Sequence, residues 1–202
     1  MHAGISDDLV AIAGYFTLRR NRHDGRSGGG VLVYVRNGLP CELLAQLGKS
    51  GMEGLWLLYR RCIMPREISH TLIGALYHYP KADNGKMLDY LISSLDTVSR
   101  QHLQVGIILL GDFNQLPDSQ LCSYPMRQLV TGLTRKLATL NKIYINIANW
   151  FKKPVILPGI SRSDHDSVLM APSACPKRPR RQMLQQCRRS SDLAERHYSV
   201  TI

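Results

Sequence analysis

The chain has 202 residues, of which 44% are hydrophobic, so the composition predicts one globular domain with a sizeable core and excludes a disordered chain. No apolar run approaches 18 residues, which excludes a membrane-spanning helix at the level of sequence. The net charge of +11 favours a polyanionic partner, nucleic acid before an anionic membrane surface.

The beginning of the chain and its cysteines predict the compartment. No basic segment followed by an apolar core stands at the start, so the sequence has no typical secretory signal. The five cysteines are scattered and lack zinc-ligand spacing, which favours free thiols in a reducing environment. We therefore expect an intracellular protein, nuclear or cytoplasmic, that is not secreted.

Apolar and β-branched runs predict most elements of the first half. Strands are expected over residues 10–16 and 31–35, and a hairpin over 55–59 and 71–77. Between the first two strands, residues 19–30 are rich in arginine and end in three glycines, which is typical of a basic loop.

The second half contains the clearest helical pattern. Met87, Leu91, Leu95 and Val98 recur at helical spacing, which predicts a helix over residues 84–100 with a core-facing stripe. Further expected elements are strands over 105–110, 142–145 and 155–157, and a short helix within 119–130 that Pro125 interrupts. Because strands outnumber helices and their connections vary in length, the pattern favours an α/β layered architecture with mixed sheets.

The composition changes after Pro172. Residues 1–172 are expected to form the domain, and residues 173–202 a basic, proline-containing tail that is disordered or loosely helical. This tail is either a plain linker, an added electrostatic contact for nucleic acid, or a nuclear import signal through residues 177–181.

Two short motifs point to chemistry. Gly-Asp-Phe-Asn at 111–114 follows one apolar run, and Ser-Asp-His at 163–165 precedes another. In extended chain, Asp112 and Asn114 project to the same side, where their oxygen atoms can bind a hard metal ion or a polarised water. Asp164 and His165 add a carboxylate and an imidazole that titrates near neutral pH. This combination is suited to metal-assisted hydrolysis of a phosphate ester.

Five motifs together resemble one superfamily. They are Arg-Ser-Gly-Gly-Gly-Val at 26–31, Ala-Leu-Tyr-His-Tyr-Pro at 75–80, Gly-Asp-Phe-Asn-Gln-Leu at 111–116, Leu-Thr-Arg at 133–135 and Ser-Asp-His at 163–165. In this order they resemble the endonuclease/exonuclease/phosphatase superfamily, and within it the apurinic/apyrimidinic-like endonuclease domain of LINE-type non-LTR retrotransposon replicases. The resemblance implies a DNase I-like α/β/β/α sandwich of two mixed sheets with outer helices.

The resemblance also implies a role for each matching residue. Asp112 would contact the attacking water or the metal, and Asn114 would hold the scissile phosphate or orient that water. Tyr77 would donate a hydrogen bond to a phosphate oxygen, although a plain cross-strand aromatic is the alternative. Asp164 would be a metal-side carboxylate, and His165 a general base or a donor to the transition state. The implied cofactor is Mg²⁺ or Mn²⁺, with no small-molecule cofactor.

DNA is the partner that the resemblance implies, and no membrane is expected. The side chains expected along its backbone are Arg19, Arg20, Arg22, Arg26 and Arg135.

The sequence departs from the family pattern at two places. The family's first strands, with an Asn and a metal-binding Glu, are expected upstream of residue 1, and Glu53 is no substitute because we expect it in a loop. Asn141 stands where the family has an Asp that orients the catalytic histidine. The same exchange costs a serine protease about four orders of magnitude in rate. We therefore expect weak magnesium binding, weak or absent catalysis, and marginal stability or a borrowed partner.

Three functions remain open from the sequence. The first is a DNA endonuclease of the retrotransposon type, weakened or inactive in this chain. The second is a non-catalytic module that binds nucleic acid through phosphate contacts. The third is a phosphatase of the same superfamily.

Overall fold

The computed structural model describes residues 6–22, 29–60, 67–117, 119–121, 124–160 and 163–173. Its centre is a six-stranded mixed sheet in the order β3-β4-β5-β6-β8-β7. The strands are β3 (Cys41–Leu43), β4 (Glu53–Arg60), β5 (His70–Tyr77), β6 (Val105–Asp112), β7 (Arg127–Gln128) and β8 (Asn141–Ile145). Strands β5 and β6 are parallel, as expected for a pair joined by a helical crossover, and every other pair in this sheet is antiparallel.

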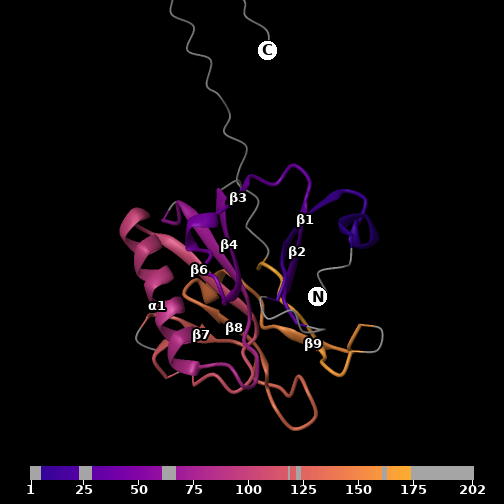
Figure 1. The fold of residues 1–202 in the computed structure, drawn as a ribbon. Helices are drawn as coiled ribbons and strands as arrows, with labels where there is room; N and C mark the ends of the chain where they lie inside the picture. The colour runs from indigo at the N-terminus through magenta and orange to yellow at the C-terminus, as the bar shows by residue number, and fades with distance from the viewer. Residues whose placement is uncertain are drawn as a thin grey trace, which may run out of the picture.

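Helix α1 (Asn84–Gln101) supplies that crossover and covers one face of the sheet (Figure 1). It begins at Asp83, whose side chain accepts a hydrogen bond from the Lys86 backbone N–H at 3.1 Å. The predicted apolar stripe packs into the main core, where Leu91 and Leu95 are fully buried together with Leu72 and Leu109 of the sheet. The prediction of this helix is confirmed.

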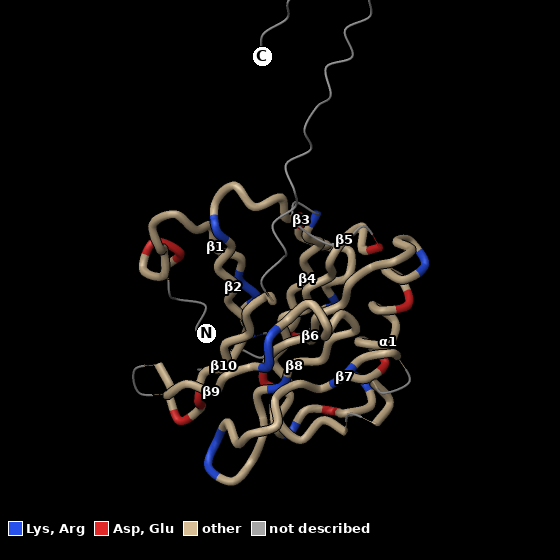
Figure 2. Tube along the Cα trace, turned by 180° about the vertical axis from the view of Figure 1, so that it is seen from behind, with Lys and Arg blue, Asp and Glu red and all other residues tan. Residues whose placement is uncertain are grey.

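Two hairpins cover the opposite face of the sheet. One consists of β1 (Tyr15–Arg20) and β2 (Val31–Arg36), and the other of β9 (Val155–Leu157) and β10 (Ser167–Leu169). Val31 and Leu18 pack onto β4 and β5, whereas Ile156 and Val168 pack beside β6 and β8. The two hairpins form separate two-stranded sheets, and both lie away from α1 in Figures 1 and 2.

The expected four layers are confirmed only in part. Within the described residues the layers are one α-helix, the six-stranded sheet and the paired hairpins, without an α-helix over the outer side of the hairpins. Val155 and Leu169, which pair directly across β9 and β10, are accordingly 54% and 53% exposed. No helix in the described part of the chain is long and apolar enough to cross a membrane.

Several predicted boundaries were wrong. The first strand begins at Tyr15, not at residue 10, because 3-10 helix η1 (Asp7–Val10) occupies the earlier part and Tyr15–Arg20 pairs in full with Val31–Arg36. Within 119–130 the described residues hold the short strand β7, which was not foreseen, and Leu121 is helical in 3-10 geometry; residues 122 and 123 of the predicted short helix lie outside the described residues. Two 3-10 helices, η2 (Ala45–Leu47) and η4 (Ala148–Trp150), and strand β3 were not foreseen. Apart from Ser173, the predicted tail lies outside the described residues.

Candidate active site

One row of polar side chains crosses four neighbouring strands. The strand register pairs Glu53 of β4 with Tyr77 of β5, Tyr77 with Asp112 of β6, and Asp112 with Asn141 of β8. Residues paired in this way project to the same face of a sheet, about 4.8 Å apart per strand. That face is the one under the hairpins, because Tyr77 packs with Val31 of β2.

This row corrects one sequence expectation. Glu53 is the first residue of β4 and lies in the row, two strands from Asp112, whereas a loop position was expected. The loop assignment was wrong because strand β4 extends two residues before the apolar run that starts at Leu55.

The glycine of the Gly-Asp-Phe-Asn motif makes the row possible. Gly111 has a φ of 143°, and a Cβ on it would stand 1.9 Å from the carbonyl oxygen of Leu76. Any other residue would therefore force β5 and β6 apart at this level. Gly111 thus places Asp112 directly beside Tyr77.

His165 reaches the row from the hairpin layer. Its Nδ1 lies 3.2 Å from Oδ1 of Asn141, and it stands two residues before β10. Asn141 also donates from Nδ2 to the backbone oxygen of Asp166 at 3.0 Å, which fixes the orientation of its amide. The Ser163 hydroxyl accepts from the His165 backbone N–H at 3.1 Å and so holds the loop in shape. These contacts bring His165 to Asn141, and the strand register places Asn141 beside Asp112.

Thr134 holds this part of the site together, a role that the sequence did not assign to it. It is fully buried, and its Oγ1 accepts from the backbone N–H groups of Leu140 (2.9 Å) and Asn141 (3.0 Å). Its carbonyl oxygen accepts from the Asp166 N–H at 2.7 Å. The Leu-Thr-Arg motif at 133–135 pointed to this segment of the sequence, but the motif does not reveal that its threonine connects two layers of the fold.

Asn114 supports Asp112 from beneath. Its backbone N–H donates to Oδ1 of Asp112 at 3.1 Å, and its Nδ2 donates to the carbonyl of His78 at 2.7 Å. Asn114 is 7% exposed and has a left-handed φ of 45°, which asparagine tolerates better than most residues. The structure therefore shows this side chain bracing the ends of β5 and β6.

Burial raises the pKa of Asp112, because removing the carboxylate from water disfavours its charged form. Hydrogen bonding from Asn114 and the nearby charges of His165 and Arg135 oppose this shift. Burial also raises the pKa of Tyr77, and the carboxylates of Asp112 and Glu53 act in the same direction. The pKa of Tyr77 is thus affected by both carboxylates of the row, Asp112 and Glu53.

Arg135 forms an ion pair with Asp164 at the rim. Its Nη2 lies 2.5 Å from Oδ2 of the carboxylate, and both side chains are partly exposed. Hydrogen bonding from Arg135 lowers the pKa of Asp164. The predicted metal-side carboxylate and the predicted DNA-contacting arginine thus contact each other.

Of the predicted basic cluster, Arg22 lies at the site. Its Nε is 3.9 Å from Oε1 of Glu53, and its guanidinium lies 4.1 Å from the centre of the Tyr79 ring. Arg19 and Arg20 belong to β1, not to a loop; Arg19 pairs with Asp7 at 3.2 Å, and Arg20 donates to the carbonyl of Lys49. Arg26 lies outside the described residues.

The described side chains do not fit a metal ion as they are arranged. No group of three or more His, Cys, Asp or Glu residues is placed to hold one in the part of the chain that the structure describes. Magnesium requires carboxylate oxygens together with water or phosphate oxygens. Here Asp164 is held by Arg135, and Glu53 by Arg22 and by the Gly30 N–H at 3.2 Å.

Comparisons with solved structures identify the fold. A scan against models of protein families finds no match, and a search of curated proteins finds none either. The endonuclease domain of TRAS1, a telomere-specific non-LTR retrotransposon, is similar with a TM-score of 0.56 and 13% identity, over 79% of this chain and 80% of that one. A protein of unknown function from Enterococcus faecalis V583 has a TM-score of 0.51 and 14% identity, over 82% and 80% of the two chains.

A third similar structure is an endonuclease/exonuclease/phosphatase family protein from Bacteroides thetaiotaomicron. Its TM-score is 0.50 and its identity 15%, over 77% of this chain and 73% of that one. At these identities the likeness concerns the fold. The predicted resemblance to the superfamily, and to a retrotransposon endonuclease domain within it, is therefore confirmed for the fold of the chain.

Proposed function

We propose that this chain binds DNA across the row of Tyr77, Asp112 and Asn141 and is a weakened endonuclease-type phosphodiester hydrolase. The observation that supports the proposal most directly is the contact of His165 with Asn141, directly opposite Asp112 in the strand register. The Asp112 carboxyl group of the central sheet and the His165 imidazole of the hairpin layer are thus both neighbours of Asn141. The similarity to the endonuclease domain of TRAS1 supports DNA as the substrate.

In this proposal each residue has a role that follows from its contacts. Asn141 Oδ1 accepts from His165 Nδ1, so Nε2 is the nitrogen that is left to exchange a proton. Asp112, held by Asn114, orients the attacking water. Tyr77 donates its hydroxyl to a phosphate oxygen, and burial, which raises its pKa, keeps that proton in place at neutral pH. As they are arranged, the described side chains do not fit a metal ion, so none of these roles is assigned through one.

The weakness of catalysis follows from Asn141. A neutral amide orients the imidazole but does not stabilise it when it becomes positively charged. The net charge of +11 still favours association with the DNA backbone.

A second candidate is DNA binding without catalysis. The ion pair of Arg135 with Asp164 favours it, because Arg135 neutralises the Asp164 carboxylate, which is then not available for catalysis.

Supercoiled plasmid separates the two candidates. The 202-residue chain is incubated with plasmid in magnesium buffer beside a variant with Asp112→Ala and His165→Ala, and binding is followed by gel shift in parallel. Nicking by the parent and not by the variant supports the hydrolase. Binding by both without nicking supports the module, and absence of binding contradicts both.

A further inference from the structure

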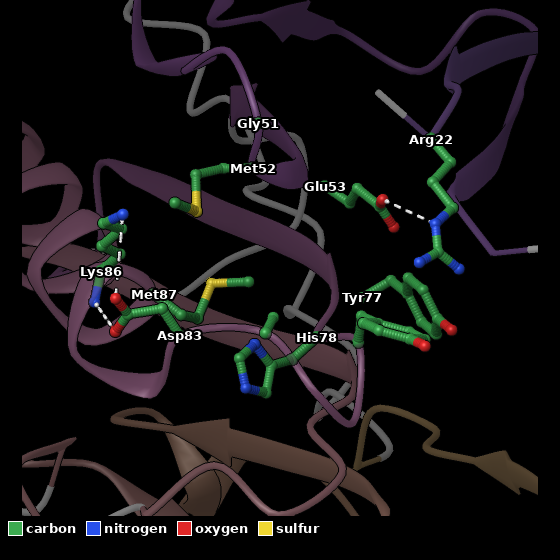
Figure 3. Close-up of a pocket in the computed structure, with 11 residues that line it drawn as sticks. Arg22, Gly51, Met52, Glu53, Tyr77, His78, Asp83, Lys86 and Met87 are labelled. Atoms are coloured by element: carbon green, nitrogen blue, oxygen red, sulfur yellow. Dashed lines mark hydrogen bonds and ion pairs between the residues drawn. The ribbon is translucent and has the colours of Figure 1, made fainter. Parts of the chain in front are cut away.

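A cavity of about 320 Å³ opens at the end of the row, and apart from Tyr77 its lining residues have no part in the proposed chemistry. It lies between the end of β1, the turn before β4, the end of β5 and the beginning of α1. In Figure 3, Met52 and Met87 lie at one end of the cavity, and Arg22 and Tyr77 at the other. Its volume is at the lower end of the range of small-ligand pockets, about 300–1,000 Å³.

The charges of the cavity wall are paired within the wall. Arg22 lies 3.9 Å from Glu53, and Lys86 lies 3.8 Å from Asp83. The Asp83 carboxylate also accepts from the Lys86 N–H at the start of α1, so an anion at this helix end would meet a negative charge. The cavity therefore suits a neutral, flat and largely apolar group better than a phosphate.

Aromatic and thioether groups provide the remaining surface. The Arg22 guanidinium lies 4.1 Å from the centre of the Tyr79 ring, and the Tyr77 ring stands beside Arg22. Gly29, with a φ of 89°, lets the chain return against these groups, since a Cβ there would stand 2.7 Å from Cε1 of Tyr77. Tyrosine rings and guanidinium planes are the surfaces on which nucleobases stack.

His78 also lines the cavity, and its ring is held in place by a hydrogen bond to α1. Its Nε2 lies 2.7 Å from Oδ1 of Asn84, so Nε2 donates and Nδ1 is left as an acceptor. Nδ1 is buried and has no hydrogen-bond partner among the described residues. Because this atom is closed off from solvent, His78 shapes the wall and is not a contact for a group bound in the cavity.

From these features we propose that the cavity binds the nucleobase next to the phosphate held at Asp112. This inference rests on the proposed function, because Tyr77 lines the cavity and is also the strand partner of Asp112. The phosphate then lies on the row while the neighbouring base stacks against Tyr79 and Arg22. The ligand class is a nucleotide with an intact base, as opposed to a bare sugar phosphate.

The test compares dAMP with 2-deoxyribose 5-phosphate, which lacks the base, by chemical-shift titration of the full chain. The parent is expected to bind dAMP about tenfold more tightly than 2-deoxyribose 5-phosphate, which is the usual contribution of one base stacked on one aromatic ring. Tyr79→Ala is expected to lose this preference, whereas Tyr79→Phe, which keeps the ring, retains it. Tyr15→Ala is the matched control, because Tyr15 is an exposed tyrosine outside the cavity.

Equal affinity of the parent for the two probes would overturn the proposal, and so would an undiminished preference in a folded Tyr79→Ala variant. A spectrum of that variant with native dispersion shows that it folds, and if it does not, the comparison of the two probes on the parent decides alone. Because the titration requires no cleavage, its outcome is separate from that of plasmid nicking, which tests the proposed function.

Discussion

The contact between Asn141 and His165 leads to a gain-of-function prediction. With a 3.2 Å separation, Asn141→Asp replaces a neutral acceptor by a carboxylate at hydrogen-bond distance from the imidazole. A hydrogen bond to a charged group contributes about 1.5–3 kcal/mol, against about 0.5–1.5 kcal/mol for a neutral one. The difference of about 1.5 kcal/mol favours the charged imidazole and corresponds to about a tenfold faster nicking rate.

The same substitution has a structural cost. Residue 141 is the direct strand partner of Asp112, so the variant places two carboxylates opposite each other on one face. Like charges at such a position destabilise a sheet by about 0.5–1 kcal/mol. We therefore expect Asn141→Asp to be the faster nuclease and the less stable protein.

Initial rates of plasmid nicking and urea unfolding measure the two effects. Asn37→Asp is the control, since it adds the same charge at an exposed turn away from the row. A variant at 141 that nicks no faster than the parent, or no faster than the control, would refute the assigned role of the Asn141–His165 contact.

Three further predictions concern the surroundings of this contact. Burial raises the pKa of Asp112, so the folded chain binds the carboxyl proton of Asp112 more tightly than the unfolded chain does. The stability that this proton contributes is lost as the pH rises through the pKa of Asp112 in the folded chain. Asp112→Asn should abolish nicking yet melt at a higher temperature than the parent at pH 7, with the gap closing near about pH 3; a constant gap would contradict this. Thr134→Val leaves two backbone N–H groups without an acceptor and should cost about 2 kcal/mol in urea unfolding, whereas Thr134→Ser should recover most of it. Arg135→Ala should reduce the slope of log affinity for DNA against log salt by about one, and an unchanged slope would show that Arg135 contacts no phosphate.

Local patterns were sufficient to find the helix and most strands of the central sheet, and to select the candidate site residues. Helix α1 and strands β4, β5, β6 and β8 follow from periodicity and apolar runs in single segments. Asp112 and His165 were identifiable because each stands next to such a run. The strand over residues 10–16 was misplaced because the apolar run of Val10 to Phe16 is a weaker determinant than the register with β2.

Relations between distant segments could not be predicted from local pattern. The position of Glu53 in the row depends on the register of β4 with β5, and register is set by pairing across the sheet. The role of Thr134 depends on two loops that meet only in the folded chain. The pairing of Arg135 with Asp164, two residues predicted for separate roles, depends on the same meeting.

The ion pair of Arg135 with Asp164 links the binding of a phosphate at Arg135 to the interactions of the Asp164 carboxylate. Arg135 keeps the pKa of Asp164 low and also favours the charged form of Asp112. A phosphate that binds Arg135 must compete with the Asp164 carboxylate, and the carboxylate is released when the phosphate wins. A freed carboxylate beside a bound phosphate is the donor set that a hard cation prefers.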